Sequence, residues 1–189
     1  MTPEVVLDAA AISRSVRRLA HEIVEHDGVA NLVLLGVVRR GAILATRLAG
    51  VIEQISGQSV ARGTLDISLY RDDGEADANH RDPRLLGRDV PGQLDGLRVV
   101  LVDDVLYTGR TIRAAFDAIS DLGRPESIEL AVLIDRGHRE LPIRADYVGK
   151  TVNSPHGTRV YVRLIEVDGA DCVVLGGPKS ESRRPTQAR

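Results

Sequence analysis

An apolar run that ends in two adjacent carboxylates restricts the fold of this chain more than any other feature. Residues 99–102 read Val-Val-Leu-Val, and Asp103 and Asp104 follow directly. An unbroken apolar run of this length is typical of a strand buried on both faces of a parallel sheet. Residues 111–119 then carry apolar side chains at helical spacing. The order of strand, polar turn and helix predicts an α/β fold with a ligand site at the carboxyl ends of its strands.

The turn between this strand and this helix has the composition of a phosphate site. Residues 105–111 read Val-Leu-Tyr-Thr-Gly-Arg-Thr. The free N–H groups and positive dipole end of a helix N-terminus bind anions, and Gly109 permits close approach of the backbone. Since two carboxylates would repel that phosphate, Asp103 and Asp104 are expected to accept hydrogen bonds from sugar hydroxyls or to attract a hydrated divalent cation. We therefore expect a phosphorylated, hydroxyl-rich and metal-chelated ligand.

A second strand, turn and helix repeat this layout with the opposite charge. Residues 31–38 have the pattern of a buried strand, and residues 42–52 have that of a helix. Arg39, Arg40 and Gly41 form the turn between them. Two guanidinium groups beside a helix N-terminus suit bidentate recognition of phosphate or pyrophosphate oxygens. An exposed basic turn without a ligand is the alternative.

The first helix is predicted over residues 9–26, with Asp8 as its N-cap and Gly28 ending it. Its polar face carries Arg14, Arg17, Arg18 and His21 at positions i, i+3, i+4 and i+7. This face is either solvated surface or a surface for the phosphate backbone of a nucleic acid.

The remaining pattern predicts one doubly wound domain over residues 1–176. Residues 64–70 alternate as an edge strand, and further strands are predicted at residues 127–134, 146–149, 159–166 and 171–175. Residues 71–96 are polar and lack a sustained period, which predicts a long flexible loop. Residues 177–189 are predicted to be a disordered tail.

Composition narrows the class of protein. The chain has 189 residues, 43% of them hydrophobic, no Trp and one Phe, which suits a single core of aliphatic side chains in a parallel α/β sheet. Cys172 is the single cysteine, so a disulfide framework and a cysteine-based zinc site are excluded. We expect a cytoplasmic protein without a membrane segment. The net charge of -2 gives no general attraction to nucleic acid, so RNA binding would need a local basic patch.

Residues 99–111 resemble the phosphoribosyl pyrophosphate (PRPP) motif of the type I phosphoribosyltransferases: hydrophobic residues, two acids, then Thr-Gly-Xaa-Thr. The resemblance extends nearly end to end to one branch of that family, which combines uracil phosphoribosyltransferase activity with attenuation of pyrimidine operons. Residues 130–146 are the longest of the similar stretches. It implies the type I phosphoribosyltransferase fold, a mostly parallel sheet with helices on both faces and a flexible loop or hood.

The resemblance implies transfer of ribose 5-phosphate from PRPP to N1 of uracil, giving UMP and pyrophosphate. Magnesium would be carried by PRPP near Asp103 and Asp104, with no direct protein ligand. The implied catalytic residues are Asp103, Asp104 and Arg40, and the implied uracil pocket contains Arg136 and Val160. The implied PRPP and nucleotide contacts are Arg39, Arg40, Gly41, Asp103, Asp104, Val105, Leu106, Tyr107, Thr108, Gly109, Arg110 and Thr111.

For the regulatory role, the resemblance implies binding to pyrimidine leader mRNA in response to UMP or UTP, and a homodimer or higher homo-oligomer. The implied RNA face comprises Arg17, Arg18, His21, His138, Arg139, Arg144 and Lys150. Two single residues and one short segment depart from the family pattern. Arg39 stands where the family usually has Thr, Arg17 replaces another Thr, and residues 153–158 read Asn-Ser-Pro-His-Gly-Thr in place of Pro-Thr-Ser-Arg-Ser-Glu.

Two alternatives remain open from the sequence. Arg39 in the pyrophosphate turn favours an RNA-binding nucleotide sensor without significant transferase activity. A different pocket formed by the loop around Arg136 would instead make the chain a phosphoribosyltransferase for another base.

Overall fold

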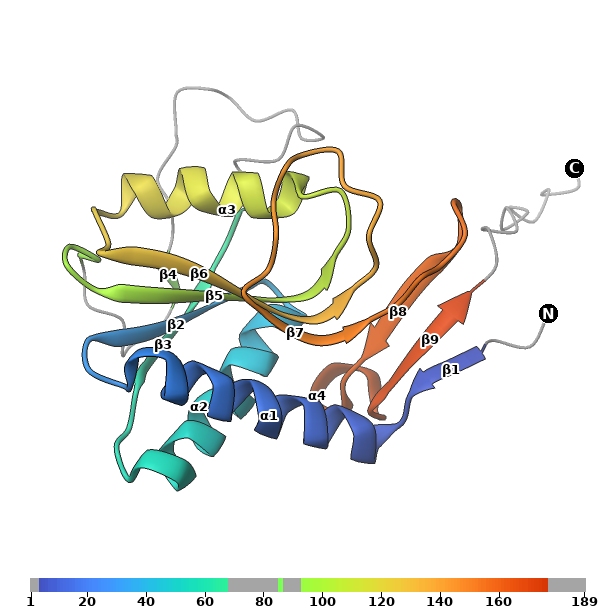
Figure 1. Ribbon diagram of the computed structural model, residues 1–189, viewed down its shortest axis with the longest axis horizontal. Helices are drawn as coiled ribbons and strands as arrows, with labels where there is room; N and C mark the ends of the chain where they lie inside the picture. The colour runs from blue at the N-terminus through green and yellow to red at the C-terminus, as the bar shows by residue number, and fades with distance from the viewer. Residues whose placement is uncertain (1–3, 68–84, 87–92, 177–189) are drawn as a thin grey trace, which may run out of the picture.

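A central sheet and a smaller second sheet build the protein in the computed structural model, which describes residues 4–67, 85–86 and 93–176 (Figure 1). The central sheet is six-stranded, in the order β4-β3-β2-β5-β6-β7, and β4 alone runs antiparallel to its neighbour. Its strands are β2 (Leu32–Val37), β3 (Ala61–Leu65), β4 (Leu85–Leu86), β5 (Arg98–Leu106), β6 (Ser127–Asp135) and β7 (Tyr147–Thr151).

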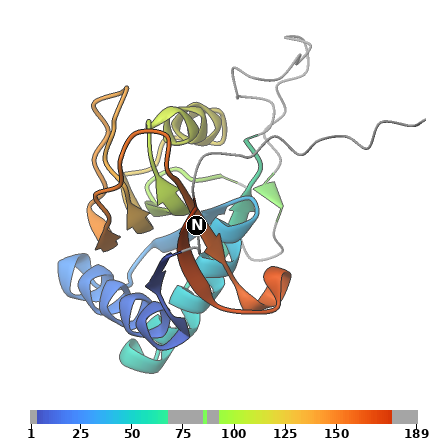
Figure 2. The ribbon, with the colours of Figure 1, turned by 90° about the vertical axis from the view of Figure 1, so that its right-hand side faces the viewer.

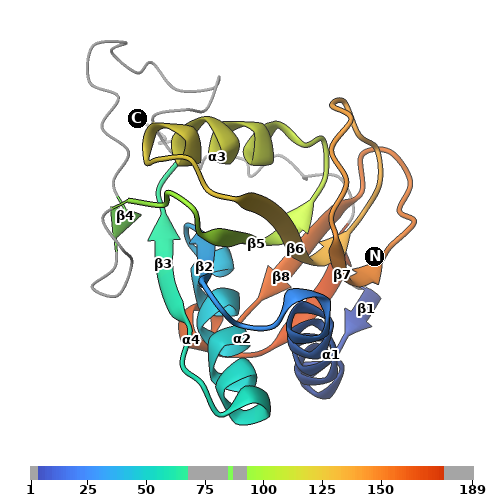
Figure 3. The same cartoon turned by 60° about the vertical axis from the view of Figure 1, so that its left-hand side comes forward.

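Helices cover both faces of this sheet, as the sequence predicted (Figures 1 and 3). Helices α1 (Ala9–Asp27) and α2 (Arg40–Ser56) lie on one face, and α3 (Arg110–Asp121) lies on the other. The alternation of a strand divides its side chains between the two faces. In β2, Leu34 packs with α1 and α2, and its neighbour Leu35 packs with α3. The apolar runs are unbroken because both faces are buried.

The smaller sheet joins the two ends of the described chain (Figure 2). It is three-stranded and antiparallel, in the order β1-β9-β8, with β1 at Glu4–Leu7, β8 at Arg159–Arg163 and β9 at Cys172–Gly176. Helix α4 (Ile165–Asp168) connects β8 to β9. Leu7, Val162 and Val173 join the same core cluster as α1 and α2. The small sheet is therefore packed onto the central unit.

Most predicted elements are confirmed within one to four residues. Asp8 caps α1 as predicted, since its Oδ1 accepts a hydrogen bond from the N–H of Ala11 at 2.7 Å. Gly28 ends α1, and its N–H donates to the carbonyl of Val24. The apolar positions of the predicted helix are buried, so the periodicity identified the correct face.

Some boundaries were wrong. The strand predicted at residues 64–70 is β3, which begins at Ala61 and ends at Leu65. The strand predicted at residues 159–166 ends at Arg163, because the chain turns into α4. The predicted loop contains the short strand β4, and the rest of residues 71–92 lies outside the described residues, as does the predicted tail 177–189. In the described part, no helix combines the length and the apolar character that crossing a membrane requires.

Candidate functional site

The arginine turn after β2 lies against the end of β5 that carries the two carboxylates. Gly36 of β2 pairs in register with Val102 of β5, so the following turn reaches the level of Asp103. A Cβ atom on Gly41 would lie 2.3 Å from the carbonyl oxygen of Val102, a distance that leaves no room for a side chain. Glycine at position 41 thus lets the first turn of α2 pack directly on β5. The acids and the basic turn form one site.

The two carboxylates are withdrawn from solvent at this junction. Asp103 is only 6% exposed, and its Oδ1 accepts a hydrogen bond from the N–H of Asp104 at 2.9 Å. Burial raises the pKa of the Asp104 carboxyl above its ordinary value, and the charge of Arg40 opposes that rise. Arg40 is therefore close enough to Asp104 to act on it electrostatically. A hydroxyl donor or a hydrated cation would compensate the cost of burying these acids.

The turn that the sequence predicted to bind phosphate is a concave loop. Residues 105–112 line a cavity of about 210 Å³ at the N-terminus of α3. Gly109 is the N-cap with φ 93°, a left-handed conformation that favours glycine, and it has no side chain to cap the helix. The N–H of Arg110 donates to Oγ1 of Thr108 at 3.4 Å, and the N–H groups that follow have no capping side chain among the described residues. This loop has the geometry and polarity of an anion site.

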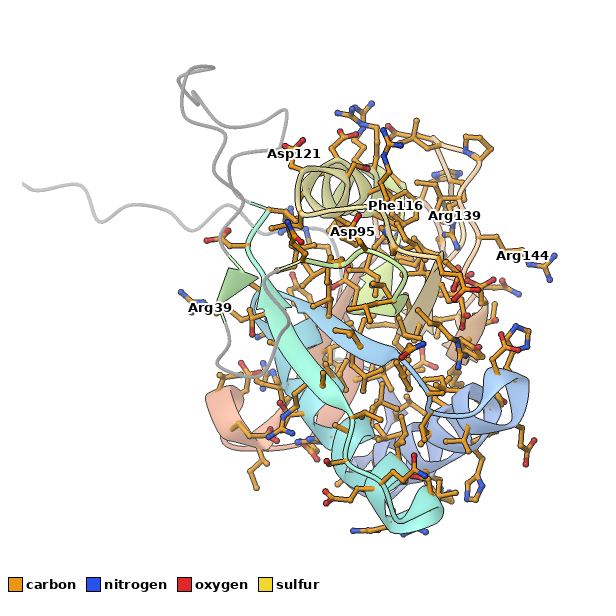
Figure 4. All side chains as sticks on the ribbon, turned by 90° about the vertical axis from the view of Figure 1, so that its left-hand side faces the viewer. Arg39, Asp95, Phe116, Asp121, Arg139 and Arg144 are labelled. Carbon is orange, nitrogen blue, oxygen red and sulfur yellow. The ribbon has the colours of Figure 1, made fainter. Side chains whose placement is uncertain are left out.

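The two arginines of the turn differ in their surroundings. The side chain of Arg39 is exposed and points away from the protein (Figure 4), and the peptide bond before it is cis. The guanidinium of Arg40 instead donates to both carboxylate oxygens of Asp168, with Nη2 at 2.8 Å from Oδ1. Only Arg40 is held beside Asp104.

A buried arginine lies next to the phosphate loop. Arg136 is 7% exposed, and its guanidinium carbon stacks 3.9 Å from the centroid of the Tyr107 ring. Its Nε and Nη2 atoms have no hydrogen-bond partner in the described part of the chain. A buried N–H without an acceptor is costly, so this side chain suits a ligand that offers carbonyl oxygens. Val160, the other predicted base contact, lies on β8, which contacts β5.

Two interactions around this pocket were not predicted. Arg139 donates to the carbonyls of Tyr107, Gly137 and Ile143 and to the carboxylate of Asp135, which ties the phosphate loop to the loop after β6. The rings of His138 and His156 lie 4.0 Å apart, measured between centroids. Neither contact has a sequence signal, because each joins segments that only the fold brings together.

The residues predicted to bind RNA fall into two groups. Arg17, His21 and Arg144 are exposed, and Arg144 projects outward in Figure 4. Arg18 is also exposed, but it donates to Glu22 and to the carbonyls of Val148 and Gly149, which fastens α1 to β7. The remaining residues are Lys150, which donates to the Val6 carbonyl, and His138 and Arg139, which lie in the loop after β6. Contact between α1 and β7 places Arg17, His21 and Lys150 on neighbouring elements.

Oxygen donors for a cation at this site come from Asp103 and Asp104. A separate group of metal-ligand types in the described part, His26, Asp27 and Glu129, has its ligand atoms within 4.8 Å of one another. It lies at the opposite end of the sheet, where Glu129 already accepts hydrogen bonds from Arg98 and Tyr147. That group is not part of the site.

Comparisons with known proteins assign the chain to a family. Residues 4–162 match the family model of the phosphoribosyl transferase domain. The chain is 58% identical over 171 residues to the bifunctional protein PyrR of Pelotomaculum thermopropionicum, covering 90% of this chain and 93% of that protein. It is 52% identical over 172 residues to the bifunctional protein PyrR of Bacillus subtilis, covering 90% of this chain and 95% of that protein.

Solved structures with low sequence identity share the fold. A hypoxanthine phosphoribosyltransferase from Staphylococcus aureus superposes with a TM-score of 0.67 at 20% identity, covering 94% of this chain and 93% of that one. The hypoxanthine phosphoribosyltransferase of Trypanosoma cruzi has a TM-score of 0.68 at 19% identity, covering 93% of this chain and 97% of that one.

Proposed function

The chain belongs to the phosphoribosyltransferase family, within its PyrR proteins, and from this premise we propose a uracil phosphoribosyltransferase that also regulates pyrimidine genes by binding mRNA. One observation carries the transferase half. The carboxylates at the end of β5, the cavity of the phosphate loop and Arg40 meet at a single edge of the sheet. This arrangement matches the three parts of PRPP, which are the ribose hydroxyls, the 5-phosphate and the pyrophosphate.

In the proposed reaction, the bond between C1 of the ribose and the pyrophosphate oxygen breaks and a bond from C1 to N1 of uracil forms, while the N1 proton passes to the departing pyrophosphate or to water. Positive charge develops on the ribose and negative charge on the leaving group, so fixed charges supply most of the stabilisation. Asp103 and Asp104 hold the ribose hydroxyls, and the N–H groups at the start of α3 hold the 5-phosphate. Arg40 stabilises the pyrophosphate as it leaves.

The pair of carboxylates, with Asp103 buried and Asp104 partly buried, also fits a hydrated divalent cation, because oxygen donors are the ligands that Mg²⁺ prefers. When bound with PRPP, Mg²⁺ would neutralise part of the pyrophosphate charge. Asp103 and Asp104 would hold its water shell together with the sugar hydroxyls.

Uracil recognition in this proposal depends on Arg136. Its unpartnered Nε and Nη2 groups donate to carbonyl oxygens of the base, while Tyr107 holds the guanidinium plane by stacking. Val160 would close the other side of the pocket. Any preference for uracil over another base is set here.

The test of the transferase is a direct assay of purified protein with PRPP, Mg²⁺ and uracil, with UMP quantified by chromatography. We expect UMP to form, and Asp104→Asn to lower the rate by about 100-fold because it removes charge beside the developing cation. Hypoxanthine and orotate serve as alternative acceptors. Absence of UMP with both proteins would reject the transferase, and UMP-dependent RNA binding without turnover would establish a sensor.

The RNA half is proposed for a cytoplasmic homo-oligomer that responds to UMP or UTP, and the surface around α1 and β7 is the proposed contact. Arg17 and Arg144 are the sharpest probes, because both are exposed and neither side chain has a hydrogen bond or ion pair within the described part of the chain. The salt dependence of binding to pyrimidine leader RNA should lose about one unit of slope for each of Arg17→Ala and Arg144→Ala. Arg62→Ala, an exposed arginine on β3, is the matched control. Equal slopes in all three variants would remove this face from the proposal.

A further inference from the structure

One edge of the Arg40 guanidinium is bound by a carboxylate of α4, that of Asp168. Nε of Arg40 lies 3.2 Å from Oδ2 of Asp168, and Nη2 lies 2.8 Å from Oδ1 and 3.1 Å from Oδ2. The side chains of Arg40 and Asp168 remain 36% and 22% exposed. The Nε edge of the guanidinium is therefore occupied, and Nη1 is the nitrogen outside this bidentate pair.

Asp168 is itself held in place. Its Oδ2 accepts a hydrogen bond from the N–H of Leu164 at 2.9 Å, which closes α4 around the carboxylate. Helix α4 is further fastened to α2, since Arg47 donates to both Glu166 and Asp171. Hydrogen bonds from Arg40 and from the Leu164 backbone lower the pKa of Asp168, so the carboxylate stays charged at neutral pH.

The position of Arg40 in α2 makes such a partner necessary. Arg40 is the first residue of α2, where the positive end of the helix dipole repels a cation. A long, exposed side chain in that field gains freedom by turning toward water. A fixed carboxylate opposes both effects and keeps the guanidinium near Asp104. The positive charge of Arg40 there lowers the pKa of the Asp104 carboxyl, against the rise that burial causes.

We propose that Asp168 is the positioning residue for Arg40, holding its Nε edge so that Nη1 faces the pyrophosphate of PRPP. This inference rests on the proposed function and adds a residue outside the three segments of the site. Since α4 follows β8 directly, Asp168 also links the strand that carries Val160 to the pyrophosphate turn.

The experiment replaces Asp168 by Asn, which keeps the shape and the Leu164 hydrogen bond but removes the charge. We expect KM for PRPP to rise about three- to tenfold, with KM for uracil unchanged, because the lost alignment concerns pyrophosphate alone. Asp168→Glu, which restores the charge, should recover part of the affinity. Calorimetric titration with Mg²⁺ and PRPP gives the dissociation constant without turnover, so it remains informative if no UMP is formed.

The matched control is Asp171→Asn, which removes one of the two carboxylates on Arg47 beside α4 and leaves Arg40 untouched. Because Glu166 still accepts hydrogen bonds from Arg47, α4 stays attached to α2, and the constants for PRPP should change by less than about twofold. A second measurement combines Asp168→Asn with Arg40→Lys, because an ammonium cannot form the bidentate pair. In the Arg40→Lys background, Asp168→Asn should change the dissociation constant for PRPP by less than about twofold. The proposal is overturned if Asp168→Asn leaves PRPP binding unchanged or tightens it, or if Asp171→Asn weakens it equally.

Discussion

At the scale of single residues, close packing of the backbone builds this site as much as charge does. Gly41 lets the first turn of α2 touch β5, and a Cβ on Gly36 would meet the Cα of Ala42 at 2.3 Å. Arg139 also fixes the backbone near the site, because its side chain donates hydrogen bonds to several backbone carbonyls at once. These residues set the positions of the groups that we propose to contact PRPP.

Gly41→Ala is expected to destabilise the protein by about 1 to 3 kcal/mol, because the new methyl group must displace the Val102 carbonyl or the turn itself. Urea unfolding measures the change. Gly50→Ala in the same helix is the control, since a Cβ there has nothing within 4 Å. That control should be neutral or stabilise the helix by up to about 1 kcal/mol. Equal effects at both positions would contradict the packing argument.

Arg139→Ala is expected to cost about 2 kcal/mol of stability and to weaken PRPP binding, because the carbonyls of Tyr107 and Gly137 lose their donor. Thermal unfolding and calorimetric titration measure the two effects. Arg144→Ala removes an exposed arginine of the neighbouring loop and should change stability by less than about 0.5 kcal/mol. A neutral Arg139→Ala would show that the loop is held by its other contacts.

At the scale of elements, a buried polar network joins the start of β5 to α1, β6 and β7. Arg98 donates to Glu129 and to the carbonyls of Ile23 and Gly28, where α1 ends. The hydroxyl of Tyr147 donates to Glu129 at 2.6 Å. The network binds the carbonyl of Ile23, near the end of α1, and that of Gly28, which ends the helix, at the sheet end opposite to the candidate site.

Glu129→Gln is expected to destabilise the protein by about 3 kcal/mol at pH 7, because it leaves Arg98 buried without its counter-charge. Burial alone would raise the pKa of Glu129, but the hydrogen bonds from Arg98 and Tyr147 lower it below its ordinary value. The stabilisation is therefore present above pH 4.5, the ordinary pKa, and is lost as the pH falls through the lower folded value.

Urea midpoints at neutral and acid pH test this dependence. The gap between wild type and Glu129→Gln should narrow below pH 4.5. The control is Glu126→Gln, which changes an exposed glutamate directly before β6. Its free energy of unfolding should remain within about 0.5 kcal/mol of wild type. A gap that stays constant with pH would assign the effect to packing rather than to charge.

At the scale of the whole molecule, the small sheet is attached through its apolar face and through two arginines of α2. Val162 and Val173 enter the core shared with α1 and α2. Arg47 holds Glu166 and Asp171, and Arg40 holds Asp168. The charged contacts set the orientation of α4, while the apolar contacts supply the larger part of the attachment energy.

Arg47→Met should therefore loosen the small sheet without unfolding the central one. We expect faster amide hydrogen exchange in β8 and β9 and unchanged exchange in β5, measured by mass spectrometry. Arg14→Met, an exposed arginine of α1, is the control for loss of charge.

Acid pH should reproduce the effect of Arg47→Met. Hydrogen bonds from Arg47 lower the pKa of Glu166 and Asp171, so their stabilising contribution is lost as the pH falls through the lowered values and these groups are protonated. Uniform exchange changes across both sheets would contradict this division.

The sequence alone determined the α/β class, the buried strands, the helix faces and the phosphate loop, because each depends on neighbours within about ten residues. Tertiary structure decided the contacts between distant segments. The pairing of β1 with β9, the stacking of Arg136 on Tyr107 and the hold of Asp168 on Arg40 join residues far apart in the chain. Such contacts leave no periodicity or spacing, since only the folded backbone brings their members within hydrogen-bonding distance.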